Sequence, residues 1–348
     1  MAPTLQKAVV IQRDGSVALR EITVPKAGPN EILVKVIAAG QNPTDWKTAR
    51  YGKRAGTVSG CDFSGIGLRS VGGRVAGLVQ GGSSHYGAFS EYLITDADFV
   101  VHIPDTWSSE DAAQLGVAPL TALRVLYEIL KLPEPLRTPA AQPQIQIQLQ
   151  IPILISGGAT SVGQYAIQFA KFSGLYVIAT ASQRNFGLVH SLGADLVVDY
   201  GDPVAAVKQI RVAAPNLEHA VDCVGEGTSP KIVIASFNGK GTLAQLTLSP
   251  YNPVPVEGVK IISSVIFEWI GKDYDFPVPF TASPKLKENG RKWVRVLSEL
   301  LLKTNLRPNP VMIQPHGLAS VEEGFQYMSE GKVSAQKITY RIADTPSE

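Results

Sequence analysis

The sequence has 348 residues, of which 45% are hydrophobic and 18% charged, and its formal net charge is +2. This length suggests about two domains, and the composition is that of a chain with a sizeable core rather than a disordered one. The basic residues are scattered, so attraction to nucleic acid is not implied and we expect no nucleic-acid partner. The two cysteines, Cys61 and Cys223, exclude a disulfide framework and a four-cysteine zinc lobe. No secretory signal or run of ~20 apolar residues is visible, so we expect a soluble, cytoplasmic protein without membrane contact.

The first 120 residues contain short β-type runs separated by glycine. The runs are KAVVIQ (7–12), EILVKVIAAG (31–40), GRVAGLVQGG (73–82) and GAFSEYLIT (87–95). Such spacing favours a β-rich, partly closed domain over alternating strands and helices.

The pattern changes near residue 121. A helical stretch at 121–130 is followed by a Pro/Gln segment at 132–152, which we interpret as a surface loop leading into a strand. Strand–helix alternation then runs from ILISGG (153–158) to VKIISSVIF (259–267), which indicates a parallel sheet covered on both faces. Two helices, at 291–305 and 321–331, and a strand at 337–342 follow. We expect an α/β fold with domains at 1–120 and 121–280, and a return to the first domain at 281–348.

The stretch SGGATSVG (156–163) joins a predicted strand to an amphipathic helix. Aligned on Gly158 and Gly163, it is a G-x-G-x-x-G pattern with Thr160 at its second glycine. Gly158 permits a tight turn, Gly163 permits close packing of helix on strand, and backbone N–H groups at the helix N-terminus favour an anion. The hydroxyls of Thr160 and Ser161 could also donate to phosphate. The alternative is a glycine-rich turn without a ligand.

The end of the next predicted strand indicates which dinucleotide is bound. NAD sites carry an acidic residue there, but this strand ends in Ser182, Gln183, Arg184 and Asn185. Hydroxyl, guanidinium and amide groups would bind a 2′-phosphate that a carboxylate would repel, and Tyr200 ends the following strand. We therefore predict NADPH, although Arg184 could be only a solvated charge.

Seven motifs together resemble the medium-chain dehydrogenase/reductase superfamily. They are GQNPTDWK (40–47), GCDFSG (60–65), VGGRVAG (71–77), GAFSEY (87–92), SGGATSVG (156–163), LGADLVVDY (192–200) and GKVSAQKI (331–338). The NPTDWK motif, the Ala-Thr-Ser turn and the Pro/Gln insertion are similar to those of fungal trans-acting enoyl reductases. The resemblance implies a GroES-like catalytic domain with a Rossmann NADPH-binding domain. It also implies an acyl carrier protein of a polyketide or polyketide–peptide synthase as partner.

The resemblance also bears on metal binding. Zinc-dependent members of the superfamily carry Cys at the position of Asn42 and a His-Glu pair at Cys61-Asp62. Asn is not a usual zinc ligand, so we predict a zinc-free reductase with no metal. A site that recruits a distant histidine is the alternative. Without a metal, the natural chemistry is reduction of a C=C bond conjugated to a carbonyl, which needs hydrogen-bond donors for the enolate and a proton source.

Three residues are the catalytic candidates. Lys47 matches a nicotinamide-facing lysine of the fungal enzymes, but it could be a surface lysine. Thr121 matches a threonine near substrate and nicotinamide, but it could equally be a helix N-cap. Tyr51 lies where mitochondrial-type enoyl thioester reductases keep a proton-donating tyrosine.

The remaining assignments also follow from the resemblance. Cofactor contacts are predicted at Thr44, Asp45, Trp46, Lys47, Ala159, Thr160, Ser161, Val162, Ser182, Gln183, Arg184, Asn185, Tyr200, Leu246, Thr247, Ser334 and Ala335. The acyl pocket is predicted to be lined by Thr121, Ala122, Leu123, Arg124, Val125, Leu126, Tyr127, Glu128, Ser264, Val265, Ile266, Phe267 and Glu268.

Three functions compete. The first is a trans-acting enoyl reductase, the second a stand-alone quinone or alkenal reductase of the same fold, and the third a non-catalytic NADPH-binding protein. The segment at 66–74 is shorter than in the family, which raises the question of reduced function. The stretch 259–267 is apolar enough to pair as an edge strand, but we expect a monomer.

Overall fold

A computed structural model describes residues 2–68, 73–83, 86–135, 151–246, 256–276 and 278–347. The chain forms two compact units, one of residues 1–120 with 266–348 and the other of residues 121–265. Residues 266–280, assigned from the sequence to the nucleotide-binding domain, lie in the first unit. Most of the Pro/Gln segment (136–150) and part of the shortened segment (69–72) lie outside the described residues.

The first unit is built around an antiparallel-rich sheet. The order is β14-β15-β3-β4-β5-β7, and β6 pairs with Glu31–Lys35 of β3, on the same edge that β15 covers at Ala38–Gly40. Strand β15 is parallel to β14 and antiparallel to β3, so the last strand of the chain joins the first part of the sheet. A separate hairpin is formed by β1 and β2. The strands are β1 (Leu5–Ile11), β2 (Val17–Thr23), β3 (Glu31–Gly40), β4 (Asp62–Leu68), β5 (Arg74–Leu78), β6 (Tyr92–Asp96), β7 (Val100–His102), β14 (Val311–Gln314) and β15 (Lys337–Arg341).

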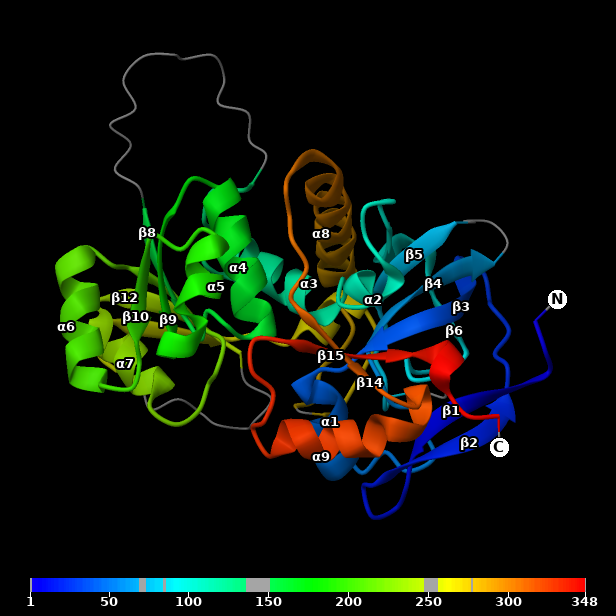
Figure 1. The fold of residues 1–348 in the computed structure, drawn as a ribbon. Coiled ribbons are helices and arrows are strands. Elements are labelled where there is room, and N and C mark those ends of the chain that lie inside the picture. Colours follow the sequence, from blue (N-terminus) through cyan, green and yellow to red (C-terminus); the bar gives the residue numbers. More distant parts are fainter. Residues whose placement is uncertain are drawn as a thin grey trace. The chain divides into compact units, whose positions relative to one another are not determined.

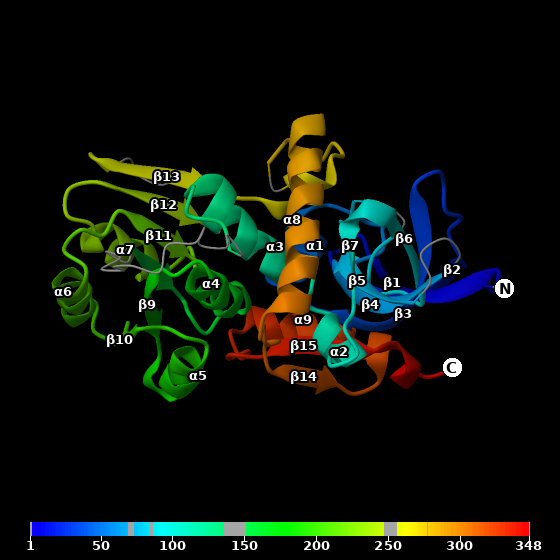
Figure 2. The ribbon, with the colours of Figure 1, turned by 90° about the horizontal axis from the view of Figure 1, so that it is seen from above.

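Several helices accompany this sheet in the described part of the first unit. They are α1 (Pro43–Tyr51), α2 (Ser109–Ala112), α8 (Pro284–Lys303) and α9 (Val321–Ser329), and Figure 2 shows α8 alongside β7. Helix α8 begins seven residues before the predicted start at 291, because Ser283 caps it and Pro284 occupies its first turn. The core combines both ends of the chain: Val9 and Val34 pack in one cluster with Phe325 and Tyr340.

The second unit is a doubly wound parallel sheet. Its order, β10-β9-β8-β11-β12-β13, is that of the Rossmann fold. Figure 1 shows the strands between α4 and α5 on one side and α6 and α7 on the other. The strands are β8 (Pro152–Ser156), β9 (Tyr176–Ala181), β10 (Leu196–Asp199), β11 (His219–Asp222), β12 (Gly241–Gln245) and β13 (Val259–Ser263). The helices are α4 (Ser161–Phe172), α5 (Phe186–Ser191), α6 (Pro203–Ala213) and α7 (Ser229–Ser236).

Two predicted elements differ from those observed. The strand expected over 259–267 ends at Ser263, and Ile266–Ile270 is a 3-10 helix whose Ile266, Phe267 and Trp269 are buried. The apolar run therefore reflects burial, not a continuous strand. The helix expected to open at Thr121 begins earlier, as α3 (Val117–Leu123), and continues as a π-helix over Arg124–Ile129.

Candidate functional site

The glycine-rich turn lies between β8 and α4. Gly157 has a φ of 80°, in the left-handed region that favours glycine. The tight turn therefore depends on Gly157, and the prediction that Gly158 provides it is wrong. Gly158 instead allows close packing, because a Cβ there would lie 2.9 Å from the Cβ of Ala179.

Gly163 brings helix α4 against the turn, as predicted. A Cβ on Gly163 would lie 2.2 Å from the carbonyl oxygen of Gly157. Thr160 is the N-cap of α4: its Oγ1 accepts a bond from the Gly163 N–H (3.1 Å) and donates to the Gly157 carbonyl (2.7 Å). In this structure the Thr160 hydroxyl donates within the turn, and its predicted bond to phosphate stays a prediction. The backbone of the turn keeps its predicted place at a helix N-terminus.

A buried polar network lies next to the glycine-rich turn and contacts its backbone; the sequence analysis did not predict it. The Ser156 hydroxyl lies 3.1 Å from that of Thr180 and 2.7 Å from that of Ser229, and Ser229 donates to Asp222 (2.7 Å). Thr180 also accepts from the Gly157 N–H (3.0 Å). These residues end or follow neighbouring parallel strands, so the network joins the carboxyl ends of β8, β9 and β11. In the sequence, the only indication of this network is that these small polar residues lie at or after the ends of apolar runs.

The predicted 2′-phosphate residues lie at the same edge of this sheet. Asp199 pairs with Ala181, so Tyr200 and Ser182 both follow aligned strand ends. Arg184 is exposed and has no ion-pair partner among the described residues. The Asn185 side chain donates to the Ser182 hydroxyl (3.1 Å). Leu246 follows β12 at this edge, and Thr247 lies outside the described residues.

The predicted pocket residues 121–128 are mostly buried in the helix that runs from α3 into the π-helix. Thr121 is 6% exposed and lies within α3, so its interpretation as an N-cap is wrong. The Tyr127 hydroxyl donates to the Phe169 carbonyl (2.9 Å), and the Arg124 guanidinium donates to the Val265 carbonyl. The polar groups of Arg124 and Tyr127 therefore bind within the second unit, which leaves the other side chains as the better candidates for a pocket wall.

The second predicted pocket segment is divided between the units. Ser264 and Val265 end the second unit, whereas Ile266, Phe267 and Glu268 belong to the first. The Ser264 hydroxyl is buried and has no hydrogen-bond partner among the described residues. A buried hydroxyl without a partner is costly, so a ligand oxygen at this position would be favourable.

Helix α1 carries the predicted residues Thr44 to Lys47. Thr44 and Asp45 are buried, and the Lys47 ammonium lies 5.5 Å from the centre of the Trp46 ring. Tyr51 is 64% exposed at the end of the helix, with its ring 6.0 Å from that of Trp46. Lys47 and Tyr51 are thus near the same indole, on one helix.

The carboxyl group of Asp45 is tied to the residue that precedes α1. Its Oδ2 accepts from the Asn42 N–H (2.7 Å), and its Oδ1 is buried with no hydrogen-bond partner among the described residues. Burial raises the pKa of Asp45 to about 7, an effect that nearby Asp62 reinforces and Lys337 opposes. Burial likewise raises the pKa of Cys61. Cys61 is therefore a buried neutral thiol.

A buried ion pair adjoins these residues and was missed in the sequence. The Lys337 ammonium lies 2.8 Å from Asp62 Oδ2 and donates to Asn42 Oδ1 (2.6 Å). Lys337 is 1% exposed and Asp62 0%. A lysine at the start of the strand KITYRI was the signal, because a buried charge requires a partner. The partners themselves are 275 and 295 residues away.

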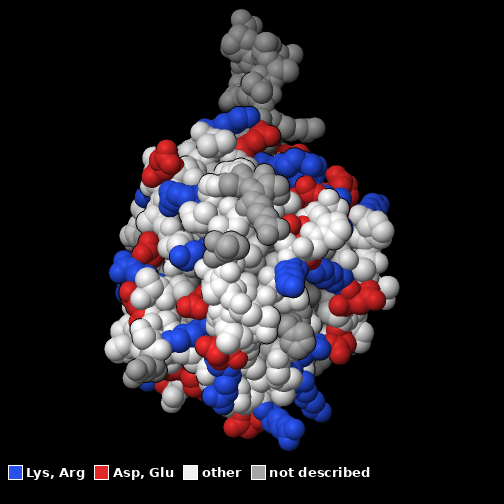
Figure 3. Space-filling view, turned by 90° about the vertical axis from the view of Figure 1, so that its right-hand side faces the viewer, with Lys and Arg blue, Asp and Glu red and all other residues white. Residues whose placement is uncertain are grey.

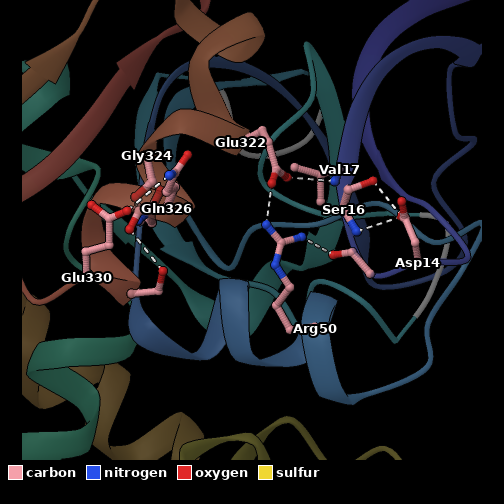
Figure 4. Close-up of polar contacts among 11 residues, drawn as sticks. Asp14, Ser16, Val17, Arg50, Glu322, Gly324, Gln326 and Glu330 are labelled. Carbon is pink, nitrogen blue, oxygen red and sulfur yellow. Dashed lines mark hydrogen bonds and ion pairs between the residues drawn. The ribbon is translucent and has the colours of Figure 1, made fainter.

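The far end of α1 is fixed by a second set of contacts. Figure 4 shows the Arg50 guanidinium paired with Glu322 on α9. The same guanidinium donates to the carbonyl oxygen of Gly15. The other oxygen of Glu322 accepts from the Val17 N–H (2.8 Å). Helix α1 is therefore held at one end by β15 and at the other by α9, two elements of the C-terminal return.

The predicted contacts at Ser334 and Ala335 lie just before β15. Ala335 has a φ of 57°, which is uncommon for a residue with a side chain. Such strain costs on the order of 1 kcal/mol and often occurs where a ligand binds. Lys337, two residues further on, contacts Asn42, which places this segment beside the start of α1.

Other classes of site are not seen in the described part of the chain. There, no three His, Cys, Asp or Glu side chains come together as metal ligands, and no helix is long and apolar enough to cross a membrane. On the face drawn in Figure 3, acidic and basic side chains are interspersed.

Comparison with known proteins identifies the family. The alcohol dehydrogenase GroES-like domain model matches residues 28–105, and the zinc-binding dehydrogenase model matches residues 161–268. The trans-enoyl reductase ACTTS2 of Alternaria alternata is 35% identical, over 97% of this chain and 99% of that protein. The chain belongs to the trans-enoyl reductase family. A trans-enoyl reductase of Gibberella fujikuroi is 32% identical, over 98% of this chain and 99% of the relative.

Solved structures agree with this assignment at the level of fold. The structure of mycobacterial Rv1454c complexed with NADPH has a TM-score of 0.73 and 20% sequence identity, and the match covers 96% of this chain and 99% of that one. The fold class predicted from the sequence, a GroES-like unit with a Rossmann unit, is confirmed, and so is the resemblance to the superfamily and to the fungal trans-enoyl reductases.

Proposed function

We propose that this protein is a trans-acting enoyl reductase that uses NADPH in the cytoplasm, in secondary-metabolite biosynthesis. Its substrate is the C=C bond of an α,β-unsaturated acyl thioester on the acyl carrier protein of a polyketide or polyketide–peptide hybrid synthase. The observation that carries this proposal is the 35% identity over nearly the full length of both chains to a protein named as a trans-enoyl reductase.

The second unit fits a dinucleotide. The approach of Gly163 to the Gly157 carbonyl leaves no room for a Cβ, so the turn keeps its backbone accessible at the start of α4. Backbone N–H groups at a helix N-terminus favour a pyrophosphate. Ala159 to Val162 would hold that group. The structure of Rv1454c is described as complexed with NADPH, which supports a dinucleotide in a chain of the same fold.

The choice of NADPH rests on the ends of β9 and β10. Arg184 is an exposed cation without an ion-pair partner among the described residues, and no carboxylate replaces it at the end of β9. A guanidinium binds phosphate through several parallel hydrogen bonds. Ser182, Asn185 and Tyr200, at the same edge, would complete the contacts with the 2′-phosphate and adenosine.

The reaction places simple demands on the protein. When bound, NADPH supplies a hydride for the β-carbon of the substrate. The protein must then stabilise negative charge on the thioester carbonyl oxygen and deliver a proton to the α-carbon. Lys47 is the proposed donor to the oxygen or to the cofactor ribose, Thr121 contacts the substrate, and Tyr51 is a candidate proton source. Apolar side chains of 121–126 and 264–267 would form the acyl pocket.

The proposal excludes a zinc mechanism. The ammonium of Lys337 already lies between Asn42 and Asp62, and a divalent cation beside it would be repelled. Among the described residues, no alternative ligand set exists. We expect the protein to act as a monomer with a mass of 37.2 kDa in solution.

The experiment compares matched substrates. NADPH oxidation is measured with one enoyl chain presented on a carrier protein, on pantetheine and as a small free enone, and also with a quinone. We expect the carrier-bound thioester to be reduced fastest, because binding of the arm and chain improves placement, and a misplacement of ~1 Å costs about a hundredfold in rate. The variant Lys47→Ala should lower this rate, with Lys53→Ala on the loop after α1 as the matched control. Faster turnover of the quinone, unaffected by Lys47→Ala, would instead identify a stand-alone quinone reductase.

A further inference from the structure

Three segments distant in the sequence end at one place in the sheet of the first unit. Gly40, the last residue of β3, pairs with Asp62, the first residue of β4, on one side and with Thr339 of β15 on the other. Lys337, at the start of β15, therefore reaches across the end of β3. The register of the sheet alone brings the lysine to the aspartate.

Lys337 fixes the side chain of Asn42 in one orientation. An ammonium group only donates hydrogen bonds, so the amide must turn its Oδ1 toward Lys337 Nζ, 2.6 Å away. The other end of the amide, Nδ2, is buried and has no hydrogen-bond partner among the described residues. The contact with Lys337 accordingly sets the orientation of this amide.

The same cluster holds the starts of two helices that carry proposed catalytic residues. Asn42 immediately precedes α1, which carries Lys47. Asp62 accepts from Lys337 with Oδ2, and with Oδ1 it accepts from the N–H of Val117, the first residue of α3 (2.6 Å). Helix α3 carries Thr121. One buried ammonium thus connects α1 to α3 through Asn42 and Asp62.

Two glycines leave no room for these contacts to move. A Cβ on Gly40 would lie 2.8 Å from Lys337 Cε and 2.3 Å from the Ala113 carbonyl oxygen. A Cβ on Gly116 would lie 2.3 Å from Asp62 Oδ1. The cluster is therefore packed against backbone on two sides, and a shift of either helix must strain or break it.

We propose that Lys337 is a positioning residue for the reduction: through Asn42 it fixes α1, and so the place of Lys47 relative to the reacting groups. The inference rests on the proposed function for its catalytic part, since Lys47 acts in that reaction. Lys337 itself touches neither substrate nor cofactor in this proposal. Its contribution is geometric, and hydride transfer is sensitive to geometry.

The main test removes the ammonium without leaving a buried unpaired charge. In the double variant Asp62→Asn/Lys337→Met, the length of the lysine side chain is nearly kept, and the new amide at position 62 retains an oxygen for the Val117 N–H. Replacing a buried ion pair by neutral groups of similar volume is often neutral for stability. We expect the melting temperature to stay within a few degrees of the parent protein, and kcat for the enoyl thioester to fall at least tenfold. The Kd for NADPH should change less than threefold.

A double-mutant cycle separates positioning from general loss of structure. Lys47→Ala is combined with the Asp62→Asn/Lys337→Met pair. If Lys337 acts through Lys47, the pair causes no further fall in kcat once Lys47 is gone. An equal fall in both backgrounds would overturn the proposal, as would a folded double variant with parental kcat. If the double variant does not fold, Asn42→Leu, which leaves the ion pair intact, enters the same cycle.

Hydrogen exchange provides a readout that does not depend on activity. Amides of residues 44–51 should exchange at least tenfold faster in the double variant, whereas those of α8 should not change. If the parent protein does not reduce enoyl thioesters, the proposed function fails. Exchange then decides the inference by itself, because unchanged protection of α1 would show that Lys337 does not fix this helix.

Discussion

The glycine turn of the second unit and the buried cluster of Asn42, Asp62 and Lys337 in the first unit both fix the start of a helix, but by different interactions. The turn places a helix N-terminus with residues that are all within seven positions, Gly157 to Gly163. The cluster places two helix starts with Asn42, Asp62 and Lys337, which span 295 residues. The turn depends on the absence of side chains, whereas the cluster depends on charge.

The comparison teaches how each kind of site fails. A local turn is broken by added volume, since its atoms are fixed by neighbours in the chain. A distant cluster is broken by loss of one partner, because the remaining charge stays buried without compensation. The four predictions below test this difference, beginning with the largest expected effect.

Removal of the Lys337 charge alone should be the most damaging change. Lys337→Met leaves the carboxylate of Asp62 fully buried beside an apolar side chain, and breaking such a pair costs about 3–5 kcal/mol of the free energy of unfolding. Urea denaturation measures this loss. The control is Lys332→Met, because the ion pair of Lys332 with Glu330 is exposed and screened by solvent, so its loss should change stability little. Equal effects of the two variants would contradict the assigned role of burial.

Added volume in the glycine turn should lower the stability less than the loss of the Lys337 charge does. It should lower the affinity for NADPH more. Gly163→Ala places a Cβ 2.2 Å from the Gly157 oxygen, and overpacking of this kind costs about 1–3 kcal/mol. The start of α4 must then move, so the Kd for NADPH, measured by fluorescence titration, should rise more than tenfold. Gly187→Ala on α5 is the matched control, because no atom lies within 4 Å of its Cβ. An unchanged Kd for NADPH in Gly163→Ala would show that the turn does not contact the cofactor.

Reversal of charge at Arg184 should alter the choice of cofactor. In Arg184→Asp the 2′-phosphate loses a cation and meets an anion, so we expect the ratio of Kd values for NADPH and NADH to shift at least tenfold, or about 1.4 kcal/mol, toward NADH. The ratio also controls for misfolding, because misfolding would weaken the binding of both cofactors and leave the ratio unchanged. An equal loss for both would show that Arg184 does not contact the 2′-phosphate.

Neutralisation of Asp45 should change the pH dependence of stability. The folded pKa of about 7 lies above the ordinary 3.8, so the folded state binds this proton more tightly, and the free energy of unfolding falls as pH rises between these values. Asp45→Asn cannot titrate. Relative to the parent, its stability should rise as pH rises over this interval. Cys61, Asp62 and Lys337 face the same carboxyl and remain in both proteins. Parallel curves from pH 4 to 8 would refute the shift.

The sequence predicted local features well, and distant ones poorly. The alternation after residue 151 predicted the Rossmann unit because each strand and helix is specified by its own apolar pattern. Gly163 was correctly interpreted, whereas Gly157 was not, because a motif aligned on spacing does not reveal which glycine has positive φ. Thr121 seemed able to cap a helix, but the observed partner of the helix start is Asp62, 55 residues before Val117. No window of the sequence contains both residues.

The position of β15 has a consequence for how the protein is made. Strand β15 lies between β14 and β3, and Ile338 and Tyr340 belong to the core that also contains Val9 and Val34. A ribosome therefore releases the residues of the Rossmann unit well before the segment that completes the first sheet. During synthesis the second unit can fold as a continuous segment, while the end of β3 at Ala38–Gly40 still lacks its partner β15. Until residue 337 emerges, Asp62 also lacks its cation, so the half-made first unit is the stage at which a chaperone would be needed most.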